Sequence, residues 1–371
     1  MRIDRIEVYY VKNPMISPWR TAYGEDADIY SILVKMCSDE HSGWAEASPL
    51  FAPTYSPEFA YGVYHLVCKM FAPLIIGKDI ESAQEINNIL SVFKGNPFAK
   101  SALEMAWWVL KANMEKKPLH KLLGGSSDEV EVGADFGITD NIDELLVKIQ
   151  GAVSAGFKRV KLKVKPGKDI DVLREVRKNF PNHTFHIDCN SGYTLDDLPL
   201  FKEIDKFGLA MIEQPLYHMD LIDHAKLQKA IETPICLDES CNSIYAAQKA
   251  IELGSCKYIN IKPGRVGGIS NSLEIIRMCE EAGIGNWIGG MLETSIGAGI
   301  CIELATLNNM TYPSDLFSSD TYYKKDISFE PIVYSSPGKM KPSQVPGTPY
   351  LPDPAILKER TIFSEVIELS E

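Results

Sequence analysis

Long apolar runs, clustered basic charge and closely paired cysteines are all missing from this sequence. No uninterrupted apolar segment reaches the roughly 18 residues that a membrane-spanning helix needs, and the amino terminus alternates polar and apolar residues instead of forming a signal peptide. Aspartate and glutamate (50) outnumber lysine and arginine (38), which gives a net charge of −12 without a basic stripe. These absences argue against a membrane protein and against a nucleic-acid-binding protein.

Metal-type Cys-x-x-Cys pairs are also lacking, although the chain contains 8 cysteines. Several of the cysteines lie within apolar runs, which predicts reduced core cysteines in a cytoplasmic protein. The 371 residues suffice for one large domain and a smaller one, so folding requires neither disulfides nor a structural metal.

What the chain does contain is a series of short apolar runs, each ending in a charged residue. The charged ends follow one another at intervals of 25, 25, 25 and 24 residues. A strand, a helix and two loops need about that length, and such a period marks a repeated supersecondary unit. The runs are Val160–Lys163, Phe185–Asp188, Ala210–Glu213, Ile235–Asp238 and Ile259–Lys262.

The repeat predicts an α/β fold built from parallel βαβ units that could close into a barrel. Each run has the length and aliphatic content of a buried parallel strand, and helix-like segments lie between the runs, such as 169–180 and 270–282. We also expect strands at 129–136 and 283–290. In a barrel, the carboxyl ends of the strands meet at one mouth, so the charged residues should converge there.

The first 125 residues read as a separate α+β domain. Strands are expected at Ile3–Val11 and Ile29–Cys37, and residues 57–124 have helical patterning that is clearest over Ala99–Met114. The intervening segment, Asn13–Ala27, is either a flexible lid over a site or an ordinary surface loop. A final strand is expected at Thr361–Glu368, in a tail that should return to the first domain.

Three acidic residues end successive predicted strands: Asp188, Glu213 and Asp238. Their carboxylates are hard oxygen ligands, with no cysteine or histidine expected nearby, and such a set suits Mg²⁺, with Mn²⁺ as the alternative. The competing interpretation pairs each acid with a neighbouring lysine. Three acids at one period on successive strands favour the metal site.

Lysines stand on both sides of the acids. Lys161 and Lys163 share one face of their strand, and this face should point inward because helices bury the outer face. Lys262 ends a strand beyond the acids. A substrate held through its carboxylate would lie between two amines, which permits removal of its α-proton on one face and return on the other. A nearby dication and other cations should lower the pKa of Lys161 and Lys163, which would make such a lysine a usable base near neutral pH.

The charged residues belong to motifs that resemble those of the enolase superfamily, muconate-lactonizing (mandelate racemase) subgroup, along nearly the full chain. The motifs stand in the family's order: Lys161-x-Lys163, Asp188-x-Asn190, Glu213-Gln214-Pro215, Asp238-Glu239-Ser240 and Asn260-Ile261-Lys262. Segments 234–240, 260–268 and 289–294 resemble more closely the branch that contains o-succinylbenzoate synthase and N-succinylamino acid (N-acylamino acid) racemase.

The resemblance implies a (β/α)7β modified TIM barrel with an α+β capping domain drawn from both termini. The barrel would span residues 126–324, and the capping domain residues 1–125, completed by about 325–371. Mg²⁺ would bind Asp188, Glu213 and Asp238.

Roles for individual side chains are implied as well. Lys163 would take the α-proton, Lys161 would help to hold the substrate carboxylate, and Lys262 would stabilise the enediolate or act as the second base. Asn190 and Glu239 would support these groups from behind. The predicted substrate-binding residues are Trp19, Arg20, Tyr23, Asp135, Arg265, Gly290, Met291, Leu292 and Tyr322.

The implied activity is that of a carbon–oxygen lyase, o-succinylbenzoate synthase, which eliminates water from a cyclohexadiene carboxylate in menaquinone biosynthesis. N-succinylamino acid racemase is a second activity that the branch allows, and the lysines serve either reaction. The alternatives within the superfamily are a dipeptide epimerase and a muconate-type cycloisomerase. The dipeptide branch usually has Asp-x-Asp after the eighth strand, where we place Met291-Leu292-Glu293 in this chain.

Two interpretations come from other classes of protein. A Schiff-base lyase would need one buried lysine and no metal, which leaves the three carboxylates unexplained. A non-catalytic scaffold would tolerate loss of charged residues, yet none of the set is missing. The expected partner is a small-molecule carboxylate, and a homo-oligomer is a family expectation.

Asp135 departs from the family pattern. Relatives in this branch usually carry a small hydroxyl residue there, near the substrate carboxylate. A second acid would repel that carboxylate unless it is rotated away or paired with an arginine or lysine.

Overall fold

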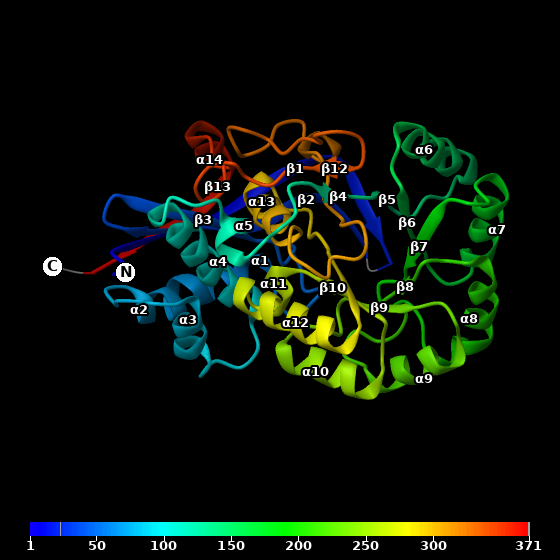
Figure 1. Ribbon diagram of the computed structural model, residues 1–371. Helices are drawn as coiled ribbons and strands as arrows, with labels where there is room; N and C mark the ends of the chain where they lie inside the picture. The colour runs from blue at the N-terminus through cyan, green and yellow to red at the C-terminus, as the bar shows by residue number, and fades with distance from the viewer. Residues whose placement is uncertain (23, 370–371) are drawn as a thin grey trace.

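The computed structural model describes residues 1–22 and 24–369. Elements from the two ends of the chain lie together on one side of the molecule, and the successive strand–helix units of residues 130–290 curl on the other (Figure 1). The structure belongs to the mixed α/β class, with a parallel barrel sheet and a separate antiparallel sheet.

The antiparallel sheet has the strand order β13-β1-β2-β3. The last strand of the chain, β13, pairs antiparallel with β1, which confirms the predicted strand at 361–368 and its return to the amino-terminal part. The strands are β1 (Arg5–Thr21), β2 (Gly24–Ser38), β3 (His41–Ala47) and β13 (Thr361–Glu368).

The prediction of a loop at 13–27 is wrong, because most of this segment continues the β1–β2 hairpin. Trp19 pairs with Asp26 and Arg20 with Glu25, after a register shift between Pro14 and Trp19. A proline offers no N–H to a ladder but is tolerated at such an irregularity. The hairpin therefore projects beyond the sheet as a two-stranded arm.

Helices cover one face of the antiparallel sheet. The longest, α4, begins one residue after Asn96, has a proline in its first turn, and confirms the predicted helix with two extra residues. It lies so close to β3 that a Cβ atom on Gly43 would be 2.2 Å from the backbone nitrogen of Leu110. The helices are α1 (Ala60–Leu66), α2 (Ala72–Ile75), α3 (Ala83–Leu90), α4 (Pro97–Met114) and α5 (Leu119–Leu123), with a π-turn at Val67–Phe71.

The parallel sheet has the strand order β11-β10-β9-β8-β7-β6-β5. Five of its strands overlap the five charged-end runs, which confirms the repeat, although β8 covers only the last two residues of its run. The strands are β5 (Ala134–Phe136), β6 (Arg159–Lys163), β7 (Thr184–Asp188), β8 (Ile212–Glu213), β9 (Ile235–Leu237), β10 (Tyr258–Ile261) and β11 (Gly285–Ile288).

Helices alternate with these strands around the outside of the sheet. Local signals set several of their ends: Asn141 and Ser243 accept backbone hydrogen bonds at helix starts, and Gly156 and Gly254 adopt positive φ at helix ends. The helices are α6 (Ile142–Ala155), α7 (Asp169–Asn179), α8 (Leu198–Ile204), α9 (Ile222–Ala230), α10 (Ile244–Leu253), α11 (Pro263–Val266), α12 (Ile269–Ala282) and α13 (Ser295–Leu304).

The segment 310–314 fills the eighth position of the barrel. It makes parallel bridges to β11 through Asn286 and to Val132 on the other side, so it joins the two ends of the parallel sheet. The predicted placement of Met291 after the eighth strand is therefore wrong, since Met291 follows β11, the seventh. The residues that follow the eighth position are Asp315, Leu316 and Phe317.

The predicted first barrel strand at 129–136 is divided in two. β4 (Val130–Glu131) pairs antiparallel with β12 (Lys339–Met340), and only β5 pairs with β6. The tail also contains α14 (Pro354–Arg360) before β13.

All eight cysteines are free and buried. In the described ranges, no helix combines the length and apolarity needed to cross a bilayer.

Candidate active site

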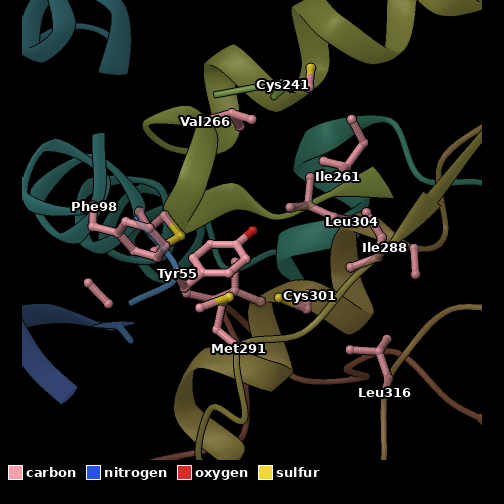
Figure 2. Packing of buried hydrophobic residues seen from close by; sticks show 14 of the residues in the cluster. Tyr55, Phe98, Cys241, Ile261, Val266, Ile288, Met291, Cys301, Leu304 and Leu316 are labelled. Atoms are coloured by element: carbon pink, nitrogen blue, oxygen red, sulfur yellow. The ribbon is translucent and has the colours of Figure 1, made fainter. Parts of the chain in front are cut away.

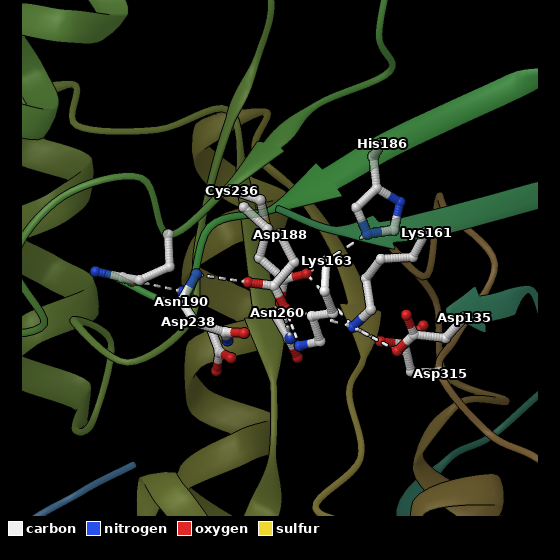
Figure 3. A network of polar contacts seen from close by, with 12 residues as sticks. Asp135, Lys161, Lys163, His186, Asp188, Asn190, Cys236, Asp238, Asn260 and Asp315 are labelled. Atoms are coloured by element: carbon white, nitrogen blue, oxygen red, sulfur yellow. Dashed lines mark hydrogen bonds and ion pairs between the residues drawn. The ribbon is translucent and has the colours of Figure 1, made fainter. Parts of the chain in front are cut away.

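The charged residues form a row along the carboxyl ends of neighbouring strands. Asp188 ends β7, Glu213 ends β8 and Asp238 directly follows β9, so the three acids occupy adjacent positions in the sheet. Lys163 ends β6 on one flank, and Lys262 follows β10 on the other. The convergence expected from the 25-residue repeat is thus present, and Figure 3 shows the network.

Each flanking lysine contacts the acid nearest to it. Lys163 Nζ lies 2.5 Å from Asp188 Oδ2, and Lys262 Nζ lies 2.8 Å from Asp238 Oδ2. The two amines therefore approach the row from opposite ends, as the strand order requires. All four side chains are at most 9 % exposed, so their charges interact with little screening.

Asp238 is the most strongly supported acid of the row. Its carboxylate accepts hydrogen bonds from Lys262, Arg265 and the hydroxyl of Tyr55. Burial raises the pKa of Asp238, but the positive charges of Lys262 and Arg265 outweigh this effect and lower it to about 2.

At Asp188, the nearby positive charges do not outweigh burial and the neighbouring negative charge. Burial first, and then the negative charge of Glu213, raise its pKa despite the nearby Lys163 and Lys161. Its Oδ1 accepts the backbone N–H of Asn190 at 2.9 Å, and Asn190 has a φ of 42°. The predicted supporting position of Asn190 thus orients the carboxylate through the main chain.

Glu213 bonds to Asn260, whose Nδ2 donates to Oε1 at 2.6 Å. Its Oε2 lies 3.5 Å from His186 Nε2, which corrects the expectation of no nearby histidine. His186 precedes Asp188 by two residues and so shares its inward face, a spacing from which it could have been found. Burial lowers the pKa of His186 well below its ordinary value, so the imidazole is neutral.

Several observations test whether the acids fit a metal ion. Glu213 Oε2 is buried and receives no hydrogen bond from the described residues, and the three acids lie on adjacent strands. In this conformation, no group of three or more His, Cys, Asp or Glu side chains within residues 1–22 and 24–369 is arranged to hold a metal ion. Asp188 and Asp238 instead face lysine ammonium groups. The all-oxygen donor set fits a hard dication if those ammonium groups withdraw.

Lys161 points inward, as predicted, into a buried cluster of acids. Its Nζ lies 3.2 Å from Asp135, 3.6 Å from both Asp188 and Glu213, and in contact with Asp315. Burial lowers the pKa of Lys161, but these acids together raise it well above its ordinary value. Carboxylates surround the amine in this structure, whereas the expected lowering of the lysine pKa assumes a neighbouring dication and so stays a prediction.

Asp315 is a site residue that the sequence did not reveal. It accepts hydrogen bonds from Lys161 and, at 2.6 Å, from Arg159. Both basic residues lie on β6, whereas Asp315 follows the eighth barrel position, which has too little apolar patterning to be recognised. Tyr55 was missed for a similar reason, since it lies in an irregular segment after β3.

The β1–β2 arm covers one side of the cavity. Trp19 lines it and meets Tyr322 edge-on at 5.7 Å. Gly290, Met291 and Leu292 also line the cavity. Tyr23 was predicted here but lies outside the described residues.

Three other predicted residues stand away from the cavity wall. Arg20 bonds to Glu25 across the hairpin at 2.6 Å and is 57 % exposed. Arg265 is buried behind Asp238 and also donates to the carbonyl of Cys241 at 2.9 Å. Glu239 is likewise buried, with one oxygen that receives no hydrogen bond in the described part of the chain.

Family models match both parts of the chain. Residues 5–124 match the mandelate racemase/muconate lactonizing enzyme N-terminal domain, and residues 144–355 match the enolase C-terminal domain-like family. The chain belongs to the enolase superfamily. Enzymes of this superfamily generally use a divalent metal ion.

Individual relatives of this enolase-superfamily chain agree in sequence and in shape. It is 39 % identical to an o-succinylbenzoate synthase of Geobacillus stearothermophilus, covering 99 % of this chain and 98 % of that one. It is also 39 % identical to an N-succinylamino acid racemase of Thermus thermophilus, over 90 % of each chain. A solved enolase-superfamily structure from Listeria innocua superposes with a TM-score of 0.96 over 100 % of both chains, at 34 % identity.

A more distant relative bears on the dipeptide alternative. The L-Ala-D/L-Glu epimerase of Bacillus subtilis is 29 % identical over 91 % of this chain and 95 % of its own length. After the eighth barrel position, the present chain has Asp315 followed by Leu316 and Phe317. The second aspartate of the Asp-x-Asp pattern is therefore missing from this chain.

Proposed function

We propose that this chain is an o-succinylbenzoate synthase that also racemises N-succinylamino acids. Both activities begin with removal of a proton α to a carboxylate. The relatives that share 35–39 % of its residues carry these two names. The observation that carries the proposal is the placement of Lys163 and Lys262 at opposite ends of the acid row, at 2.5 Å and 2.8 Å from their nearest acids.

Asp188, Glu213 and Asp238 would hold Mg²⁺, or Mn²⁺ in its place. When bound, the ion supplies positive charge that stabilises the enediolate formed from the substrate. We assign the holding of the substrate carboxylate to Lys161, which already lies beside Asp188 and Glu213. Asn190 and Glu239 lie next to the acids and help to position their carboxylates.

Lys163 acts as the base that removes the α-proton. In the synthase reaction, it returns this proton to the departing hydroxyl on the same face, while Lys262 stabilises the enediolate by its charge. In racemisation, Lys262 delivers a proton to the opposite face, and the roles reverse for the other enantiomer. The same two lysines therefore serve both reactions, and no further catalytic side chain is needed.

The cavity walls set which carboxylates enter. Trp19 and Tyr322 provide an aromatic side, and Gly290, Met291 and Leu292 provide an apolar one. We assign these residues to the part of the substrate beyond the reacting carbon. A dipeptide epimerase remains the alternative, and the incomplete Asp-x-Asp pattern disfavours it, since Asp315 is already paired with Arg159 and Lys161.

The synthase proposal is tested by turnover of the succinyl-bearing cyclohexadiene carboxylate with Mg²⁺. Lys163→Ala should abolish turnover while leaving the circular dichroism spectrum unchanged. Full activity in Lys163→Ala, or no turnover by the unmodified chain, contradicts the proposal.

The two-base arrangement is tested separately by exchange in deuterated water. Each enantiomer of an N-succinylamino acid is followed by NMR at its α-position. Lys163→Ala should retain exchange of only one enantiomer and Lys262→Ala of only the other, because each amine reaches one face. Loss of exchange of both enantiomers in both variants contradicts this assignment.

A further inference from the structure

Asp135 lines the cavity with a carboxyl group of which only one oxygen has a partner. It lies on β5 beside Lys161 of β6, and its side chain is 5 % exposed. Its Oδ2 is 3.2 Å from Lys161 Nζ. Its Oδ1 is buried and receives no hydrogen bond from residues 1–22 and 24–369. A buried oxygen without a donor is costly when the group is ionised.

The cations around Asp135 compensate its charge only in part. Lys161 is shared with Asp315, Asp188 and Glu213. Arg159 is occupied by Asp315 and by the carbonyl oxygens of Ala134 and Pro313. The groups whose charges act on Asp135, or on which its charge acts, are Lys161, Lys163, Arg159, Asp315 and Tyr322.

Burial is the largest influence on this carboxyl group. It raises the pKa of Asp135 to about 6, because the attraction of Lys161 is offset partly by repulsion from Asp315. Asp135 therefore changes charge close to neutral pH. The neighbouring acid Asp315 behaves oppositely, since Lys161 and Arg159 hold its pKa far below the ordinary range despite burial.

A substrate carboxylate held by Lys161 arrives next to this group. Two ionised carboxylates at hydrogen-bond distance in a buried site repel each other, whereas a carboxylic acid donates a short, strong hydrogen bond to a carboxylate. Asp135 can meet the substrate only by rotating away or by carrying a proton. Because Asp135 is buried between β6 and Asp315, rotation would require the surrounding side chains to rearrange, whereas protonation would not.

We propose that Asp135 binds the substrate carboxylate as a neutral acid, donating a hydrogen bond from Oδ1, so that each binding event takes up one proton from solvent. The proton stays on Asp135 while the ligand is bound and returns to solvent when the ligand leaves. Asp135 is thus a substrate-binding residue and takes no part in moving the α-proton. The inference rests on the proposed function, because it requires a carboxylate at Lys161.

Proton uptake makes affinity depend on pH in a defined direction. Below about pH 6, Asp135 is already neutral, so pH should have little effect on the dissociation constant. Above that pH, the free protein must acquire a proton in order to bind. The dissociation constant should rise up to tenfold per pH unit until the pKa of the complex is reached.

Calorimetric titration measures this proton directly. The Mg²⁺-loaded full chain is titrated with o-succinylbenzoate at pH 7.5 in two buffers that differ in protonation enthalpy. The unmodified chain should take up about one proton per ligand. Asp135→Asn should take up none and should bind with a pH-independent constant, because an amide donates a hydrogen bond at every pH. Asp135→Ser should likewise lose the uptake.

Asp169→Asn is the matched control. Asp169 is also buried, at 4 % exposed, but it accepts a hydrogen bond from the hydroxyl of Tyr193 at 2.8 Å outside this cavity. It should leave proton uptake and affinity as in the unmodified chain. Circular dichroism and thermal melting confirm that each variant is folded before titration.

The possible results separate this inference from the proposed function. Turnover without proton uptake by the unmodified chain overturns the Asp135 assignment alone, as does unchanged uptake in Asp135→Asn. Weaker binding of Asp135→Asn at every pH, with no uptake by the unmodified chain, overturns the assignment too, because it means that Asp135 stays ionised and acts on the ligand only through Lys161. Absence of both turnover and binding overturns the two proposals together.

Discussion

Tyr55 donates its phenolic hydroxyl to Asp238 Oδ1 at 2.7 Å, across 183 residues of sequence. The ring centre also lies 4.6 Å from Lys262 Nζ, and the ring packs among Phe98, Met291 and other buried apolar residues (Figure 2). One side chain from the segment after β3 therefore touches both an acid and an amine of the barrel. The amino-terminal part completes the site and does more than cover it.

Tyr55→Phe should weaken metal binding. Loss of the hydroxyl removes a donor that orients Asp238, and removing such supporting hydrogen bonds lowers metal affinity by about tenfold or more. Titration with Mg²⁺, followed by calorimetry, measures the change. Tyr193→Phe is the control, because it removes a comparable Tyr–Asp hydrogen bond, at 2.8 Å to Asp169, away from the acid row. Equal Mg²⁺ affinity in Tyr55→Phe and Tyr193→Phe contradicts the prediction.

Glu46→Ala should both destabilise the protein and raise KM. Glu46 is buried on β3 and accepts hydrogen bonds from Thr294 and from the backbone N–H of Gly297, at the start of α13. Removing it leaves buried donors unpaired, which costs about 2–4 kcal/mol. It also frees the adjoining segment, where Leu292 lines the cavity.

Urea denaturation and steady-state kinetics measure these two effects of Glu46→Ala. Glu46→Gln keeps an acceptor and should recover part of both losses. Glu85→Ala removes a half-buried carboxylate that accepts one solvent-exposed backbone N–H near the start of α3, and should change stability by about 0.5–1 kcal/mol. An unchanged KM in Glu46→Ala would show that Glu46 stabilises α13 without affecting the site.

Gly43→Ala should severely destabilise the fold. The added Cβ would lie 2.2 Å from the nitrogen of Leu110 and 2.3 Å from the oxygen of Ala106. Both contacts are with α4 backbone, so β3 or α4 must move, at a cost of several kcal/mol. Gly151→Ala is the control, because Gly151 is an exposed position of α6 with open space at its Cβ. It should stabilise by about 0.5–1 kcal/mol, and thermal melting should separate the two variants clearly.

Asp220→Ala should destabilise the protein at neutral pH and less in acid. Burial raises the pKa of Asp220, but hydrogen bonds from the His224 side chain and from the backbone N–H groups of Asp223 and His224 lower it to about 2. A lowered folded-state pKa stabilises above the unfolded value near 4, and this contribution is lost as the pH falls from about 4 to about 2.

Screening by water limits the contribution of this partly exposed group to about 1 kcal/mol. Urea denaturation at pH 7 and at pH 2.5 compares Asp220→Ala with the unmodified chain. Asp223→Ala, which removes an exposed partner of Lys226, should have a smaller effect at both pH values. A loss in Asp220→Ala that does not shrink at low pH would mean that the ionised form contributes nothing.

The repeat of charged strand ends was sufficient to predict the row of acids and amines. In a parallel strand, the last inward residue faces the mouth of the barrel regardless of what surrounds it. Lys163, Asp188 and Glu213 therefore follow from spacing alone. The strand at 361–368 was also predictable, because alternation marks a sheet with one face more buried than the other.

Contacts made between distant segments were not predictable in this way. Tyr55 and Asp315 lie in stretches without periodicity, and their roles arise from where folding places them. The same holds for Asp135: the sequence showed an acid, whereas only the packing of β5 against β6 and Asp315 left one of its oxygens buried without a partner. Local periodicity determines which face a side chain occupies, but desolvation and charge pairing depend on neighbours from the whole chain, so only the tertiary structure decides them.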